Sequence, residues 1–165
     1  MKRIYCFLVM CFVFNSPFVK VFASSSDTKV KEFAYDSLRL AILGTLDKCL
    51  SGKQDQMVAD PGGLIVLLGE IDSDPARHLL LQLLDIQIGE ANSEALSYAV
   101  VKQGKKILPD LKRLLSDPIN CSILNNKNFK QTSNKLQCLT VDTRNRRINW
   151  LIDIINTGKT LEYVL

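Results

Sequence analysis

Apolar residues recur every three or four positions along most of this chain, and this spacing restricts the folds open to it more than any other feature. A helix turns once in about 3.6 residues, so this spacing collects apolar side chains on one helix face. No run of alternating apolar and polar residues is long enough to predict a strand with the same clarity. The expected fold class is therefore all-α.

Glycine, proline and small polar residues mark where the apolar stripes begin and end. Asp60-Pro61 and Asp74-Pro75 each place proline at a first helical position. Glycines follow several stripes, as expected beyond a helix C-terminus. For three helices we expect the N-cap at Asp72 or Asp74, at Asn92 or Ser93, and at Asp142 or Thr143. These signals predict about six helices, around residues 30–49, 61–69, 75–86, 93–103, 107–115 and 144–157.

The first 23 residues have the layout of a secretory signal peptide. Lys2 and Arg3 precede an unbroken apolar run over residues 4–14, and Val21 and Ala23 stand at −3 and −1 of a cleavage site. The run is shorter than the roughly 20 apolar residues that cross a bilayer. An uncleaved anchor and a buried first helix are the alternatives. We expect a signal peptide over 1–23, a helical domain over 24–165, and an exported protein, periplasmic or secreted, with no transmembrane span after cleavage.

Charge is unevenly distributed along the chain. The formal net charge of +4 derives largely from the signal segment, which holds three basic residues and no acid, so it does not point to nucleic acid. Acids dominate residues 24–101 and bases dominate 102–147. These stretches are either solvated helix faces or a basic patch for an acidic partner or anionic lipid surface. The candidate patch contains Lys105, Lys106, Lys112, Arg113, Lys127, Lys130, Arg144, Arg146 and Arg147.

Cysteine usage fits export. Cys121 and Cys138 bracket a polar stretch, and a disulfide between them is the simplest pairing in an oxidising compartment. Three cysteines follow the signal segment and allow three pairings, between which the sequence does not decide. Cys49 lies near the end of an apolar stripe and is interpreted as a small buried side chain.

The segment 118–143 lacks a sustained period and exceeds the usual length of an unstructured connection, about 12–15 residues. Closing it by the disulfide would place Phe129 near its tip, between Lys127 and Lys130. This loop is either a contact surface or an inert insertion.

Sequence motifs for catalysis are missing. The chain has one His and contains no glycine-rich phosphate loop, no Gly-x-Ser-x-Gly and no His-Glu-x-x-His. Glu70, Asp72 and Asp74 cluster in one turn, but the glycine and distal glutamate of a calcium loop are absent. We expect no enzyme, no metal and no cofactor.

Two helix pairs in the middle of the chain resemble each other. Residues 64–69 align with 99–104, and the Leu-rich stretch 80–85 aligns with 111–117. The offset of roughly 30–35 residues is typical of α-solenoids. The chain resembles HEAT-like repeat proteins of the short bacterial kind over about residues 60–117, and an ordinary helical bundle is the alternative.

The resemblance implies a short right-handed α-solenoid of antiparallel helix pairs, with the flanking helices as caps. It also implies a non-catalytic protein-binding or scaffold module, whose partner would be another exported protein. The alternative functions are a nucleic-acid-binding HEAT-like protein and a small carboxylate-dependent hydrolase.

Overall fold

The computed structural model of the chain describes residues 28–51, 60–125, 127, 129–131, 135–159 and 161. The chain divides into two units, Met1–Leu38 and Arg39–Leu165, and each is described by itself. In the first unit the described residues, 28–38, are helical and belong to α3 (Thr28–Ser51). The predicted signal peptide lies outside the described residues.

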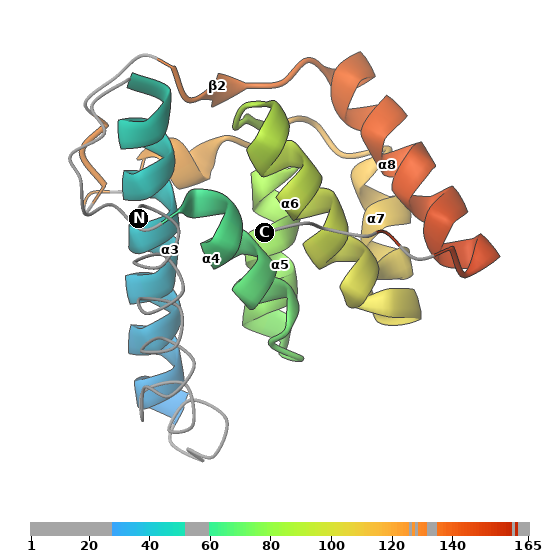
Figure 1. Cartoon of the computed structure of the whole chain (residues 1–165), viewed down its shortest axis with the longest axis horizontal. Helices are drawn as coiled ribbons and strands as arrows, with labels where there is room; N and C mark the ends of the chain where they lie inside the picture. Colours follow the sequence, from blue (N-terminus) through green and yellow to red (C-terminus); the bar gives the residue numbers. More distant parts are fainter. Residues whose placement is uncertain are drawn as a thin grey trace, which may run out of the picture. The chain divides into compact units, whose positions relative to one another are not determined.

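The second unit holds the rest of α3 and five further α-helices among its described residues. Figure 1 shows α4, α6 and α8 side by side in chain order, with α5 and α7 behind them. Contacts join α4 to α6, α6 to α8, and α7 to α8. Helices make up most of the described part, which confirms the all-α class. The helices are α4 (Pro61–Gly69), α5 (Asp74–Leu83), α6 (Glu90–Lys102), α7 (Leu108–Leu114) and α8 (Val141–Thr157), and the 3-10 helices are η1 (Gly104–Ile107) and η2 (Ser122–Asn125).

Two short strands interrupt the helical pattern. β1 (Ile86–Gln87) pairs antiparallel with β2 (Gln137–Cys138), with Ile86 opposite Cys138. The predicted stripe after Pro75 ran through Ile86, but α5 ends at Leu83, and Ile86 is buried in β1. A strand of two residues is too short to show an alternating pattern, so its sequence could not predict it.

The core of the second unit is aliphatic. Buried Leu and Ile side chains come from every α-helix of the unit and from both 3-10 helices, and each contributes about 1.5–3 kcal/mol by leaving water. The stripes that the sequence predicted supply most of them. Among the side chains with no exposed surface are Ile42, Leu43, Leu46, Ile65, Leu79, Leu83, Leu96, Val100, Ile107, Leu111, Ile148 and Leu151.

Proline and glycine set helix ends as predicted. Pro61 opens α4, and both carboxylate oxygens of Asp60 accept backbone N–H groups, from Gly62 and Gly63, at 3.1 Å. Gly104 and Gly158 have positive φ after α6 and α8, a conformation that glycine adopts without steric strain.

The other predicted N-caps were wrong by one to three positions. Ser73 caps α5 and Thr140 caps α8, because these residues are extended and their hydroxyls reach the amides of the first turn. α6 begins after Gly89 with no side-chain cap. Asn92 and Ser93 lie inside its first turn and donate to carbonyls of the preceding turn.

α4 and α6 approach each other closely at Gly69. A Cβ atom at this position would lie 2.6 Å from the Cα of Ala99 and 2.7 Å from its Cβ. Neither is the end of a flexible side chain, so the helices would have to separate. The absence of a side chain at Gly69 therefore sets the spacing of this helix pair.

We predict that Gly69→Ala destabilises the protein by about 1–3 kcal/mol through overpacking, measured by urea unfolding. Gly44→Ala is the matched control, since it lies in α3 with nothing within 4 Å of the added Cβ. The control should gain about 0.5–1 kcal/mol from helix propensity. Equal effects at both positions would contradict the close approach.

Candidate functional site

Arg144, which the sequence placed in the basic patch, is buried in the core. Its Nη1 lies 3.2 Å from Oδ1 of Asp85, and the two side chains are 0% and 3% exposed. Its Nη2 donates to the carbonyl of Asp117 at 2.7 Å. Assigning Arg144 to a partner-binding surface was therefore wrong. A guanidinium removed from water needs an internal partner for its charge, and Asp85 supplies it.

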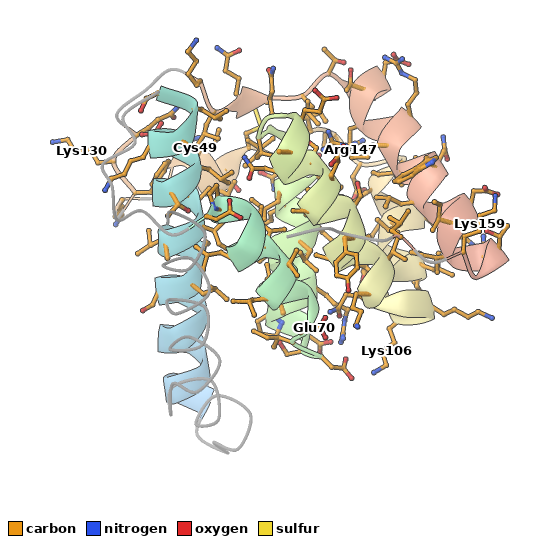
Figure 2. All side chains as sticks on the ribbon, in the orientation of Figure 1. Cys49, Glu70, Lys106, Lys130, Arg147 and Lys159 are labelled. Atoms are coloured by element: carbon orange, nitrogen blue, oxygen red, sulfur yellow. A yellow bond between two sulfur atoms is a disulfide. The ribbon has the colours of Figure 1, made fainter. Side chains whose placement is uncertain are left out.

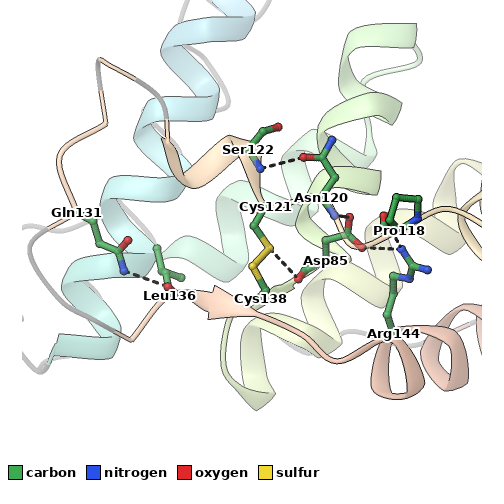
Figure 3. Close-up of a disulfide and its surroundings, with 9 residues drawn as sticks. All are labelled: Asp85, Pro118, Asn120, Cys121, Ser122, Gln131, Leu136, Cys138 and Arg144. Carbon is green, nitrogen blue, oxygen red and sulfur yellow. Dashed lines mark hydrogen bonds and ion pairs between the residues drawn. A yellow bond between two sulfur atoms is a disulfide. The ribbon is translucent and has the colours of Figure 1, made fainter.

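Asp85 also holds both ends of the polar loop, the segment closed by Cys121 and Cys138; Figure 3 shows the end at Asn120. Its Oδ2 accepts the backbone N–H of Asn120 at 2.9 Å, and its carbonyl accepts that of Leu139 at 2.8 Å. Beside these bonds a disulfide joins Cys121 to Cys138, with the Cα atoms 5.9 Å apart. The predicted pairing of these two cysteines is thus present.

Two further residues that the sequence singled out, Cys49 and Phe129, lie in the described part of the chain. Cys49 is the free cysteine of the described residues and is half-buried, so it is less enclosed than predicted. Phe129 is also half-buried, so part of its ring is withdrawn from a partner.

We predict that Asp85→Asn loses about 3–5 kcal/mol of folding stability, because it leaves Arg144 buried with an uncompensated charge. Equilibrium denaturation in urea measures the loss. Asp142→Asn breaks an exposed pair with Arg146 and should change stability by about 0–1 kcal/mol. A small effect at both sites would contradict the structural role of Asp85.

The acidic turn between α4 and α5 pairs with basic residues at the end of α6 and in η1. Glu70 lies 3.3 Å from Nζ of Lys102, and Asp72 pairs with both Lys106 and Arg77. Figure 2 shows Glu70 and Lys106 at the same end of the unit. Part of the charge separation along the sequence is thus compensated within the protein, which reduces the net charge offered to a partner.

The hydrogen bond and positive charge of Lys106, with a smaller contribution from Arg77, hold the pKa of the Asp72 carboxyl below its ordinary value of 3.8. A carboxyl whose pKa is lower in the folded than in the unfolded state stabilises the folded protein at pH values above its unfolded-state pKa. This contribution is lost as the pH falls through the folded pKa.

We predict that Lys106→Met raises the pKa of Asp72 towards 3.8, as followed by NMR titration of its carboxyl carbon. Lys105→Met is the control, because Lys105 makes no ion pair within the described residues. An unchanged pKa in Lys106→Met would show that the pair does not persist in solution.

The remaining predicted cations do not all lie at one end of the unit. Lys130 and Lys106 lie at different ends of the unit (Figure 2). Arg113 pairs with Asp110 at 3.0 Å. Lys105, Lys112, Lys127 and Lys130 are exposed and have no ion pair within the described part of the chain.

Arg147 is half-buried beside the first turn of α6. Its Nη2 donates to the hydroxyl of Ser93 at 3.1 Å, while its Nη1 is buried without a hydrogen-bond partner among the described atoms. Burial lowers the pKa of its guanidinium, but an arginine stays charged at any physiological pH. Arg147 is therefore only partly available to a partner.

Sequence reasoning missed Trp150. It is 46% exposed on α8, whereas Ile148, Leu151 and Ile155 on the opposite side are buried. A helical wheel of residues 144–157 separates Trp150 from this stripe, and that signal could have identified it. The outer face of α8 is defined here by the exposed residues Asp142, Arg146, Asn149, Trp150 and Asp153.

Within the described residues, no three His, Cys, Asp or Glu side chains are grouped so that they could hold a metal ion. The helices described here include none whose length and apolarity would suffice to cross a membrane. No protein-family model, curated protein or solved structure matches the chain.

Proposed function

We propose that the chain is an exported, non-catalytic protein-binding module of HEAT-like architecture, which contacts its partner through the outer face of α8. The exposure of Trp150 carries this proposal. Trp and Arg are the residue types most enriched at the energetic centres of protein interfaces. On this face Trp150 lies one helical turn from Arg146, whose side chain is 74% exposed.

The HEAT-like part of the proposal is supported by the order of helix contacts. α4 packs on α6 and α6 on α8, while α5 contacts both α4 and α6. In solenoid repeats each helix pair contacts its neighbours in chain order in this way. A terminal helix in such an array has one face that no further repeat covers. In the proposed architecture this is the outer face of α8.

The outer face of α8 is favoured over the basic stretch for an energetic reason. Charges on an exposed rim chiefly affect association rate and specificity, while desolvated aromatic side chains supply most lasting affinity. Several of the predicted cations already pair with acids of the same chain, as Lys106 does with Asp72. Their dispersal also weakens the nucleic-acid alternative, which needs a continuous cationic surface.

Export is supported by two independent features. The sequence over residues 1–23 has the layout of a signal peptide. The Cys121–Cys138 disulfide is a kind of bond that persists in oxidising compartments and is rare in the cytosol.

We predict that Trp150→Ala weakens capture of a partner from the exported fraction by about 30-fold, the size of a 2 kcal/mol hot spot. Glu94→Ala, at an exposed position of α6 outside the outer face of α8, is the control and should bind normally. Far-UV circular dichroism checks that both variants remain folded.

A third bait carries Lys105→Glu and Lys112→Glu, which reverse two exposed cations without an ion pair among the described residues. It should retain the partner. If this bait loses the partner and Trp150→Ala does not, the contact surface is the basic stretch. If no bait retains a protein even at low salt, the binding role itself is wrong.

A further inference from the structure

The charges on and just beyond the outer face of α8 follow an order around Trp150 that reverses in sign when it is read from the other end. Asp142 and Arg146 precede the tryptophan on the exposed side, and Asp153 follows it there. Lys159, exposed just beyond the end of the helix, completes the series (Figure 2). Along the chain the order is negative, positive, aromatic, negative, positive.

This order is complementary to its own reverse. In an antiparallel pair of helices related by a two-fold axis at Trp150, each position before the tryptophan lies opposite positions at about the same distance after it in the other copy, to within one residue for the pairs named here. Arg146 then faces Asp153 of the second copy, and Asp142 faces its Lys159. Every charge of the series meets its opposite, and each contact occurs twice by symmetry.

We infer that the outer face of α8 binds a second copy of this chain, as an antiparallel pair of α8 helices centred on Trp150. This inference rests on the proposed contact role of that face and names its partner. The two indole rings would cover each other at the axis, where aromatic stacking adds to the area buried. Two exposed indoles would thereby leave water together.

The pair between Asp142 and Arg146 within α8 does not oppose this arrangement. The two side chains are 78% and 74% exposed, and an exposed pair of this kind holds its partners weakly. Arg146 can therefore turn towards Asp153 of the second copy. The competing parallel arrangement would bring like charges together, which fixes the antiparallel orientation.

The contact is small. α8 has 17 residues and is about 25 Å long, so one helix face lies at the low end of protein interface sizes. Monomer and dimer should therefore exchange, and the fraction of dimer should rise with protein concentration.

Sedimentation equilibrium of the full chain over a wide concentration range tests the inference. The wild type should show a concentration-dependent mass, and Trp150→Ala and Arg146→Glu should each weaken the dimer by at least about tenfold. The double variant Arg146→Glu/Asp153→Arg should restore dimerisation, because it exchanges the two signs. Glu94→Ala, at an exposed position of α6 outside the outer face of α8, is the control and should dimerise as the wild type does.

Restoration by the charge exchange separates this pairing from a merely structural effect. A wild type that stays monomeric throughout, or a double variant no stronger than Arg146→Glu, overturns the inference. If that monomeric protein still captures another protein through Trp150, self-pairing fails and the proposed function stands. If the wild type dimerises and Trp150→Ala does not weaken the dimer, the α8 contact is wrong.

Discussion

The buried pair of Asp85 and Arg144 connects three parts of the second unit that lie far apart in the sequence. Asp85 follows α5, Arg144 belongs to the first turns of α8, and the carbonyls that share the guanidinium come from the residues just after α7. The same carboxylate and carbonyl also hold the two ends of the polar loop. Together with the buried side chains of Ile148 and Leu151, this ion pair holds α8 in place and so sets the direction in which Trp150 points.

Burying an ion pair is seldom the most stabilising choice, because both ions lose their hydration. It does discriminate strongly against wrong arrangements, since any register of α8 that misplaces Arg144 leaves a charge without a partner. The helix therefore has a defined rotation about its axis. This in turn fixes which residues form its outer face, and a contact surface built on one aromatic side chain requires that definition.

Much of the fold was predictable from the sequence, because it follows from local signals. The apolar stripes predicted the helices. Pro61, Gly104 and Gly158 predicted where helices begin or end, since each of these residues acts within one turn of its own position. The N-caps of α5 and α8 were missed because several adjacent residues could cap, and backbone dihedral angles decide among them. β1 and β2 were missed because their pairing depends on residues some fifty positions apart in sequence, which carry no shared local pattern.

The candidate site was less predictable for the same reason. In the sequence, Arg144 looks like any other member of a cationic run. Its burial follows from its pairing with Asp85, which only the folded chain brings beside it. Likewise Lys102 and Lys106 looked available until the turn at 70–72 was placed beside them. Trp150 differs, because its separation from the stripe of Ile148 and Leu151 is a local property that the sequence already contains.

The loop between Cys121 and Cys138 is closed at its base, and within it the side chains of Ile123 and Leu136 are buried. A disulfide, a strand pair and the two bonds to Asp85 all act at the base of the loop, around residues 120–121 and 138–139. The entropy of closing a loop grows only slowly with its length, so residues can be added between Ile123 and Leu136 at little energetic expense. The loop is therefore a position at which the chain can diverge in evolution, or accept a grafted peptide, without disturbing the packing of α5, α7 and α8.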